Sequence, residues 1–521
     1  MKLLFRTVSA MFLSLSCLRP NPAGAFAVAA FSTTTRRTMS HRGSIFLPSS
    51  LRMASTAPDT PAKNNKKKKN KQQLDVTQVI LKRNQQSKAF RNGNQLVFTR
   101  SIQKTTSAVE PGLADLVQVL VCAHHDDDAQ PPPVALGYGV YNPHSLYRVR
   151  ILCHGFLQPA LYARVAAAAQ PVEALEHIVR HHLQTAVATR RALQLPQKGG
   201  KGAVTDTYRL VNGEGDQLSG LAVDMIDTTA VVMSSAAWCE IHKDVILQSL
   251  QEELPTGTSI VWKTTPSRLV QDGYDMPLTK EEPPVDDEDP LADQVVISTE
   301  NGIKYKTYPY SDGQKTGVYC DQRENRWNLA TFCRDKRVLD LCCYHGGFSL
   351  NALINGGALS CVGVDSSPDA IAACCSNAEL NGYSANDGRI QFVRSDITAF
   401  LQESAGQAVY DVIVLDPPKL APSAAGLDKA RRKYHSFNRD AIKLIAPQGG
   451  LLLTCTCSAA MTQKDGGQYF LSMVQGAAQA TGRQVTLLRV SGAASCHTQS
   501  PISWPAGAYL TAALFYVHPI E

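Results

Sequence analysis

The chain has 521 residues, 44% of them apolar and 19% charged, which predicts two to four globular domains. Glycine (35) and proline (28) are close to average usage, so collagen-like, low-complexity and wholly disordered chains are excluded. Residues 1–73 carry 13 Lys and Arg and one acid, Asp59, whereas residues 74–521 carry 39 basic and 44 acidic residues. The folded part is therefore mildly acidic, and its bulk charge gives no argument for nucleic-acid binding.

The fourteen cysteines give no sign of a disulfide framework or a zinc site. They occur as Cys342-Cys343, Cys374-Cys375 and Cys455-Thr456-Cys457 plus isolated residues, without paired C-x-x-C sets at zinc spacing. Thiols of this kind are usually reduced core residues. We therefore expect no metal, and a reducing compartment such as stroma, matrix or cytosol.

Residues 1–73 have the composition of an organellar targeting leader and a basic linker. Basic residues precede an apolar stretch that reaches Ala23-Gly24-Ala25, and residues 26–56 are rich in Ser, Thr and Arg without any acid. A signal-like stretch followed by a transit-like one beginning at Phe26 resembles the bipartite leader of secondary plastids. Plastid (chloroplast) stroma is thus favoured over the alternative, the mitochondrial matrix. No apolar run reaches the roughly 18 residues of a membrane span, so no stable membrane association is expected.

The next part of the chain predicts a small β domain over residues 74–155. Short alternating runs bounded by turn residues predict its strands, at 76–81, 96–98, 116–122, 135–141 and 147–152.

Residues 156–300 predict a central α+β domain. Apolar periodicity predicts helices over 171–195 and 241–254 and strands at 221–225, 230–233 and 259–263. His177, His181 and His182 lie on the first helix, where a polar face explains them better than a metal site. An acidic, proline-broken segment, 281–293, predicts a loop.

Residues 301–521 alternate between apolar runs and helical patterns. Seven runs predict strands, at 338–343, 361–365, 390–393, 412–415, 451–455, 485–490 and 510–517. Helices separate the first five and a loop separates the last two, which predicts a doubly wound α/β sheet whose final strand is antiparallel. This Rossmann-like arrangement is the one used by S-adenosylmethionine (SAM) dependent methyltransferases.

The first strand-to-helix turn of this domain predicts a ligand site. Asp340 lies in the strand, and Gly346-Gly347 follow it, where glycines let the backbone approach a ligand. The spacing is not G-x-G-x-x-G, so a ligand without phosphates is favoured. Asp365 ends the second strand, where an acid typically binds ribose hydroxyls, and Asp396 follows the third, where it can reach an adenine amine. Together these acids favour SAM as the cofactor.

The fourth and fifth strands end in residues suited to base chemistry. Asp416-Pro417-Pro418-Lys419 follows the fourth, and the prolines stiffen the backbone so that a planar base could be held against the carboxylate. This motif alone is ambiguous, because amine-directed methyltransferases also use an acid or amide followed by two prolines.

The fifth strand ends in a thiol, Cys457, with Cys455 two residues earlier on the same strand face. C5 of cytosine is a poor nucleophile, so its methylation requires a thiolate to add at C6. Cys457 is suited to this addition, and Asp416 would contact N3 and the exocyclic amine. Cys455 remains a candidate, and the sequence does not identify the base that removes the C5 proton.

With these residues, the chain resembles the bacterial 23S rRNA cytosine-C5 methyltransferases that carry an N-terminal PUA domain. The similarity covers roughly residues 76–519 and rests on 208–216 with 218–224, 300–304, 313–317 with 321–323, Tyr344 with 346–348, 416–419, and the Thr-Cys-Ser end of strand five.

The resemblance implies a PUA-like RNA-binding domain over 74–155, a central linking domain, and large-subunit rRNA as the substrate. It places the nucleophile on Cys457 rather than Cys455, with Asp416 as its catalytic partner and Pro417, Pro418 and Lys419 at the substrate. The cofactor positions expected are Asp340, Tyr344, Gly346, Gly347, Phe348, Asp365, Ser366, Asp396, Asp416, Thr316, Gly317, Asp321 and Arg323.

Two departures from the family pattern matter. Gly93-Asn94-Gln95 replaces the usual His-Pro-Trp of the PUA turn, and His345 stands where the family has Thr. Two alternative functions stay open: methylation of another rRNA atom, such as a purine ring nitrogen or an exocyclic amine, and a non-catalytic rRNA-binding assembly factor. The methylated nucleotide and the oligomeric state, a homodimer included, are not decided by the sequence.

Overall fold

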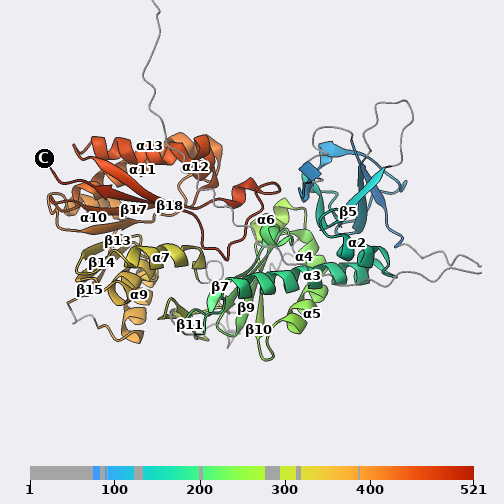
Figure 1. Cartoon of the computed structure of the whole chain (residues 1–521), viewed down its shortest axis with the longest axis horizontal. Helices are drawn as coiled ribbons and strands as arrows, with labels where there is room; N and C mark the ends of the chain where they lie inside the picture. The colour runs from blue at the N-terminus through green and yellow to red at the C-terminus, as the bar shows by residue number, and fades with distance from the viewer. Residues whose placement is uncertain are drawn as a thin grey trace, which may run out of the picture. The chain divides into compact units, whose positions relative to one another are not determined.

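The computed structural model describes residues 74–82, 89–90, 92–121, 133–198, 204–275, 294–311, 318–384 and 388–520. The predicted leader and the predicted acidic loop at 281–293 lie outside these residues, as do two predicted cofactor residues, Thr316 and Gly317. Within the described part, no helix is long and apolar enough to cross a membrane. The structure is shown in Figure 1.

The N-terminal strands form one six-stranded sheet in the order β2-β6-β5-β4-β1-β3. Their bounds are β1 (Gln78–Leu81), β2 (Leu96–Phe98), β3 (Ile102–Thr105), β4 (Leu116–Val121), β5 (Val134–Tyr141) and β6 (Tyr147–His154). Five of these were predicted, whereas β3 was missed because its sequence, IQKT, has little apolar content. Two glycines of β5 permit close approach to β6: a Cβ on Gly137 would lie 2.0 Å from the carbonyl oxygen of Cys153.

The central part packs helices against a four-stranded sheet of order β10-β9-β8-β7. The strands are β7 (Thr207–Asn212), β8 (Leu221–Ile226), β9 (Thr229–Ser234) and β10 (Ser259–Thr264); the helices are α2 (Pro159–Ala166), α3 (Pro171–Ala192), α4 (Ala237–Ile241), α5 (Lys243–Glu253) and α6 (Pro266–Gln271). The apolar stripe of α3 is buried, as its periodicity predicts. His182 of this helix is also buried and contacts the Leu152 carbonyl oxygen through Nε2 at 2.6 Å.

The third part is a seven-stranded sheet in the order β15-β14-β13-β16-β17-β19-β18. Its strands are β13 (Arg337–Leu341), β14 (Ser360–Asp365), β15 (Ile390–Arg394), β16 (Val412–Leu415), β17 (Gly450–Thr456), β18 (Val485–Ser491) and β19 (Thr511–Val517). The strands from β15 to β17 are parallel, and β19 runs antiparallel to both neighbours. The predicted doubly wound sheet with an antiparallel last strand is therefore confirmed.

Helices cover both faces of this sheet, because its strands are apolar on both sides. Figure 1 shows α11 (Leu427–Lys443) and α13 (Gln468–Gln479) on one side and α7 (Arg323–Ala330) and α9 (Pro368–Leu380) on the other. Successive residues of a strand point to opposite faces and therefore belong to different cores. Leu339 of β13 and Ile413 of β16 pack in the core with α11 and α13. Val338 and Val412 of the same strands pack in the core with α7 and α9. The remaining helices are α8 (Gly347–Leu350), α10 (Ile397–Glu403) and α12 (Ala459–Gln463).

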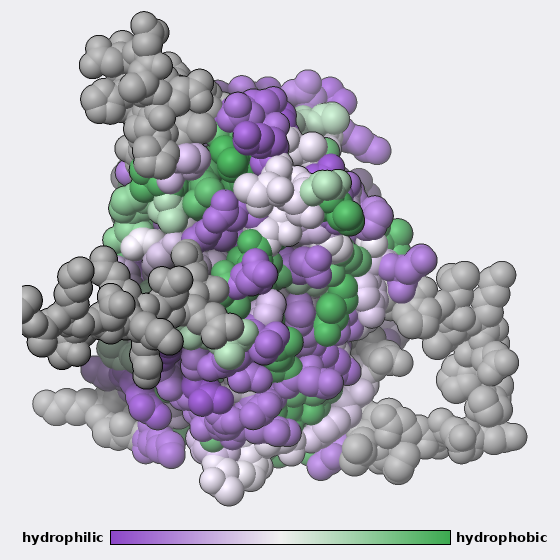
Figure 2. All heavy atoms as spheres, turned by 90° about the vertical axis from the view of Figure 1, so that its right-hand side faces the viewer, coloured by the Kyte–Doolittle hydropathy of each residue, from purple (hydrophilic) through white to green (hydrophobic). Residues whose placement is uncertain are grey.

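A hairpin of β11 (Val296–Glu300) and β12 (Ile303–Thr307) precedes the seven-stranded sheet. The turn uses Asn301 and Gly302, both at positive φ, as a two-residue hairpin loop requires. On the face seen in Figure 2, described hydrophobic side chains lie in small groups among hydrophilic ones rather than in one large field.

Candidate active site

The turn after β13 has an unusual backbone. Cys342, Tyr344 and Gly346 all have positive φ, of 65°, 52° and 81°. Two of them are not glycine, and such conformations persist only where the surroundings hold them. Cys374 contributes to this, because its thiol donates to the Tyr344 carbonyl oxygen at 2.9 Å.

Asp340 lies in β13 beneath this turn and is almost completely buried. Its Oδ2 accepts hydrogen bonds from the backbone N–H of Ser349 at 3.0 Å and from its hydroxyl at 2.8 Å. Its Oδ1 is buried and has no hydrogen-bond partner among the described residues. Burial raises the pKa of the carboxyl to about 6. A buried carboxylate oxygen without a donor fits the ammonium group of an amino-acid moiety such as that of SAM.

Asp365, at the end of β14, is bonded to the same turn. Its Oδ2 accepts from the backbone N–H of Tyr344 and its Oδ1 from that of Ser367, both at 3.0 Å. Ser366 between them is exposed. The carboxylate thus fixes the turn at the carboxyl edge of the sheet, where a ribose would be bound in this fold.

Asp396 follows β15 and is the N-cap of α10. Its Oδ1 accepts from the backbone N–H groups of Thr398 at 2.8 Å and Ala399 at 3.3 Å. The bond to Thr398 contributes most to a lowered pKa, so the group stays ionised at neutral pH. Because the side chain is exposed, the predicted contact with an adenine amine would add to this capping role.

Behind the turn, Gly347 and Phe348 contact a buried ion pair. Arg326 makes a two-pronged bond to Glu300, both N–O distances being 2.7 Å, and also donates to the Tyr319 carbonyl oxygen. Its guanidinium lies 5.9 Å from the centre of the Phe348 ring, and a Cβ on Gly347 would be 2.9 Å from its Cδ. Glycine at 347 is therefore required by this close packing, and the ion pair supports the turn.

Asp416 follows β16 and lies half-buried. Its Oδ2 accepts from Gln322 Nε2 at 3.0 Å. Burial, and then the nearby charge of Asp321, raise the pKa of Asp416 to about 7. Of the next residues, Pro417 is buried while Pro418 and Lys419 are exposed.

The two candidate thiols differ sharply in their surroundings. Cys455, within β17, is completely buried in the sheet core, and burial raises its thiol pKa well above the ordinary value. Cys457 lies one residue past the end of β17 and is half-buried. Only Cys457 therefore has the access to solvent that a substrate would need.

The residues on either side of Cys457 are anchored. The Thr456 hydroxyl shares a 2.9 Å hydrogen bond with the hydroxyl of Tyr434 on α11. Ser458 donates to the Ala421 carbonyl oxygen at 2.6 Å and caps α12 by accepting from Met461 N–H. These bonds fix the backbone of the thiol and join it to the loop after Asp416 that contains Ala421.

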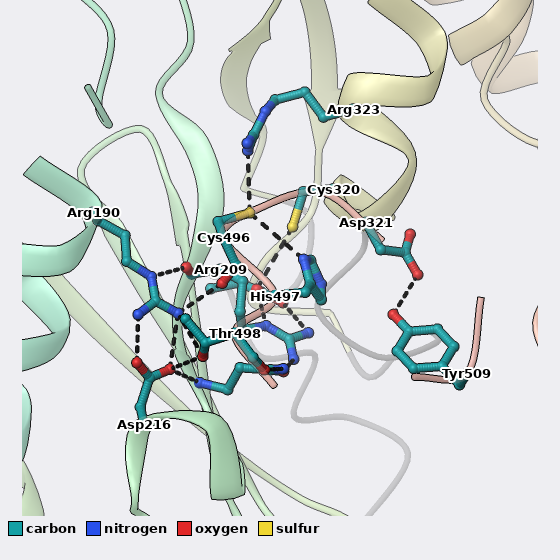
Figure 3. A network of polar contacts seen from close by, with 12 residues as sticks. Arg190, Arg209, Asp216, Cys320, Asp321, Arg323, Cys496, His497, Thr498 and Tyr509 are labelled. Carbon is teal, nitrogen blue, oxygen red and sulfur yellow. Dashed lines mark hydrogen bonds and ion pairs between the residues drawn. The ribbon is translucent and has the colours of Figure 1, made fainter. Parts of the chain in front are cut away.

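Two further predicted cofactor residues, Asp321 and Arg323, lie in a different group of contacts (Figure 3). Asp321 accepts from the Tyr509 hydroxyl at 2.7 Å, and Arg323 donates to the thiol sulfur of Cys496 at 3.2 Å. Both residues thereby join the start of the methyltransferase-like sheet region to the loop between β18 and β19.

Several residues at the site were not among the sequence candidates. Three of them lie within or near the segments 300–304 and 321–323 that carry the family resemblance: Glu300, Gln322 and Arg326. Their roles depend on bonding partners up to 94 positions away in the sequence. Ser349, which bonds Asp340, carries a weak local signal, since it lies two residues after the Gly346-Gly347 pair. Tyr434 carries none, because only the fold brings α11 to β17.

The arrangement combines a half-buried thiol, a carboxyl with a pKa near neutrality and a second, buried carboxyl beside a strained turn. A thiol and an acid at adjacent strand ends suit nucleophilic addition to a polarised ring. Among the described residues, no cluster of His, Cys, Asp and Glu could hold a metal ion.

Residues 259–477 match a family described as S-adenosylmethionine-dependent methyltransferase. The chain is 31% identical over 440 residues to ribosomal RNA large subunit methyltransferase I of Alteromonas mediterranea, covering 83% of this chain and 97% of the relative. It is 38% identical over 306 residues to the protein of the same name from Aeromonas hydrophila, covering 58% and 72%.

Solved structures show the same fold. A SAM-dependent methyltransferase from Streptococcus mutans is similar with a TM-score of 0.60 and 19% identity, over 84% of this chain and 99% of that one. A methyltransferase complexed with SAH is similar with a TM-score of 0.61 and 20% identity, over the same shares of the two chains.

Proposed function

Because the chain belongs to the ribosomal RNA large subunit methyltransferase I family, we propose that it methylates C5 of a cytosine in organellar large-subunit rRNA, with SAM as the methyl donor. The single observation that carries the choice of atom is the contrast between two thiols of one strand. Cys457 is half-buried beside the segment that follows Asp416, whereas Cys455 is enclosed in the core. Cytosine-C5 chemistry needs a nucleophilic thiol, and methylation of a nitrogen does not.

The cofactor would lie at the β13 turn. Asp340 Oδ1 would accept from the amino group of SAM, Asp365 from its ribose and Asp396 from its adenine amine. When bound, SAM supplies the methyl group as an electrophile. The support for this placement is the unpartnered buried oxygen of Asp340 and the three acids on successive strand ends.

In the proposed reaction, the Cys457 thiolate adds to C6 of the target cytosine and forms a C–S bond. The electron pair of the C5–C6 double bond then makes C5 nucleophilic. Asp416, whose pKa is raised to about 7, is partly protonated at neutral pH and can donate to N3 as negative charge develops on the ring. Gln322, which donates to the other side of this carboxyl, orients it.

After methyl transfer, the C5 proton leaves to a base and the C–S bond breaks, which releases Cys457. Of the three predicted substrate residues, Pro418 and Lys419 are exposed and would contact the base or its phosphate, whereas Pro417 is buried and would support the backbone beside Asp416. Residues 74–155 would act as a PUA-like RNA-binding domain, and the leader over residues 1–73 would direct the protein to the plastid.

Nucleoside mass spectrometry tests the proposal. The protein is incubated with methyl-labelled SAM and unmodified large-subunit rRNA transcripts of both organelles, and Cys457→Ala and Cys455→Ala are run beside it. We expect 5-methylcytidine from the wild type and from Cys455→Ala, and none from Cys457→Ala. Another methylated nucleoside that still forms with Cys457→Ala would replace the proposal by methylation of a different rRNA atom. Tight rRNA binding without SAM binding would indicate an assembly factor instead.

The proposed location has a separate test. Residues 1–73 fused to a fluorescent protein should direct it to the plastid, and accumulation in mitochondria would contradict the assignment.

A further inference from the structure

A cavity of about 490 Å³ lies outside the site described above. Its lining comes from three parts of the chain that are distant in sequence: the N-terminal sheet (98 and 144–150), the central part (212–222, 235 and 268–272), and the loop between β18 and β19 (498–509). Cavities of 300–1,000 Å³ are the usual size for small-molecule and nucleotide-sized ligands.

Three aromatic rings line one side of this cavity. Phe98 and Tyr147 have ring centres 5.3 Å apart, and Trp504 meets Tyr147 edge-on at 6.1 Å. The guanidinium of Arg150 lies 5.3 Å from the centre of the Tyr147 ring. Aromatic rings beside an arginine form the kind of surface on which unpaired nucleic-acid bases stack.

Hydrogen bonds between buried residues fix one wall of the cavity. Arg150, which is buried, donates to Asp272 at 2.8 Å and to Ser219 at 2.9 Å. The Asp272 carbonyl oxygen in turn accepts from Asn142 at 2.7 Å. On the opposite side, Gly215 lies so close to the β18–β19 loop that a Cβ there would be 2.2 Å from the carbonyl oxygen of Thr498. A site fixed in this way is preformed before any ligand arrives.

The segment 213–215 belongs to the stretch 208–216 that carries the family resemblance and has no role in the proposed chemistry. Because residues 213–215 line the cavity, the stretch 208–216 would contribute to the binding of a ligand there.

The cavity also has a positive group at its edge. Arg268, in the last turn of α6, is exposed and donates a hydrogen bond to Gln271 at 3.2 Å. No carboxylate pairs with Arg268 among the described residues, so its charge is not neutralised there, in contrast with Arg150. A guanidinium of this kind binds a phosphate group well.

The cavity is linked to the candidate active site through Tyr509. Tyr509 lines the cavity and donates to Asp321, and the next residue, Gln322, bonds Asp416. The Tyr509 carbonyl oxygen also accepts from Thr462 of α12, the helix that begins directly after Cys457 and its neighbour Ser458. The two sites are thus connected through these hydrogen bonds together with short stretches of backbone.

We propose that this cavity binds one unpaired base of the rRNA segment that flanks the target cytosine, with the base stacked on Trp504 and in edge contact with Tyr147, and with its phosphate on Arg268. The inference rests on the proposed function, in that RNA is the substrate, but not on which atom is methylated. On this proposal, the cavity at the junction of the three parts of the chain helps to determine which nucleotide reaches Cys457.

Equilibrium binding of the full chain to a labelled large-subunit rRNA transcript tests this. Trp504→Ala and Arg268→Gln are compared with Phe332→Ala, a control at an aromatic residue that is 42% exposed and does not line the cavity. We expect Trp504→Ala to weaken RNA binding by about 5- to 100-fold, as loss of a base stack does, with SAM binding unchanged. Arg268→Gln should weaken binding less and reduce its salt dependence. Since Arg268 is exposed, that variant keeps the test valid if Trp504→Ala fails to fold.

A photo-crosslinking experiment identifies the contact itself. The transcript is made with 4-thiouridine and irradiated with the wild type, and crosslinked peptides are mapped. Crosslinks to the peptides of Tyr147 or Trp504 support the proposal. RNA binding by both variants equal to that of Phe332→Ala would overturn it, even if the wild type forms 5-methylcytidine. Loss of binding in the variants together with a different methylated nucleoside would keep the cavity assignment and overturn the proposed atom.

Discussion

The proposed cofactor side and the proposed RNA side of this protein are built in opposite ways. At the cofactor side, residues that bond one another are close in sequence: Ser349 lies nine positions from Asp340, and Tyr344 lies 21 from Asp365. At the RNA side, the partners are far apart: Arg150 and Asp272 are separated by 122 positions, and Gln95 and Ser503 by 408. A site whose bonded residues are close in sequence can be predicted from motifs. A site whose bonded residues are far apart forms only when all three parts of the chain have assembled.

The largest effect is expected at Cys457, the proposed nucleophile. Cys457→Ala should reduce methyl transfer by about 10³-fold or more, because in the proposed mechanism no other group forms the C–S bond. Cys455→Ala should keep turnover near that of the wild type and lose only some stability, since Cys455 is a core residue. Single-turnover transfer measures both. Equal loss in the two variants would contradict the assignment and indicate that β17 is merely disrupted.

The buried ion pair beneath the cofactor turn gives the next effect. Glu300→Gln leaves the Arg326 guanidinium buried and unpaired, which should cost about 3–5 kcal/mol of unfolding free energy and weaken SAM binding. Glu252→Gln is the matched control, because Glu252 pairs with Arg180 at the surface and should change stability by at most about 1 kcal/mol. Urea unfolding measures both values. Equal stabilities would show that the buried pair does not support the turn.

Asp416→Asn should lower kcat by about 10²- to 10³-fold. It should also alter the pH profile. The raised pKa, about 7, means that the carboxyl is protonated below this pH and loses its proton above it, so the wild-type rate should fall on the alkaline side. An asparagine does not titrate, and this limb should vanish in the variant. Asp411→Asn, before the start of β16, should keep the limb. Its persistence in Asp416→Asn would assign the titration to another group.

The smallest effect concerns the contacts that assemble the RNA side. Ser503 accepts from Gln95 N–H at 3.0 Å and donates to the Gly93 carbonyl oxygen at 3.1 Å, so Ser503→Ala should cost about 1–2 kcal/mol of stability. It should weaken rRNA binding slightly and leave SAM binding unchanged, as calorimetry can determine. Weaker SAM binding would show that the two sides are not independent.

The contrast between local and long-range contacts also explains which parts of the structure could be predicted from the sequence. All seven strands of the large sheet follow from their apolar runs, because a buried parallel strand is apolar on both faces. The strand β3 was missed because its sequence, IQKT, has no apolar run. The hairpin of β11 and β12 was missed although IKYKT alternates between buried and exposed residues, as a strand with one buried face does.

At the site, the strand-end positions of Asp365, Asp416 and Cys457 could be inferred from the motifs. The bond from Gln322 to Asp416 could not, because it depends on how a loop folds back over the sheet. From the strand pattern alone both Cys455 and Cys457 stayed candidates, and only the family resemblance favoured Cys457. The difference in burial between the two thiols could not be predicted, because both lie on the same strand face.

The most direct test of the central claim is to trap the covalent intermediate. RNA carrying 5-fluorocytidine retains fluorine at C5, which cannot leave as a proton does, so the C–S bond formed at C6 should persist after methyl transfer. Peptide mass spectrometry of the trapped complex should locate the RNA adduct on Cys457. An adduct on Cys455, or complete methylation without any adduct, would contradict the proposed mechanism.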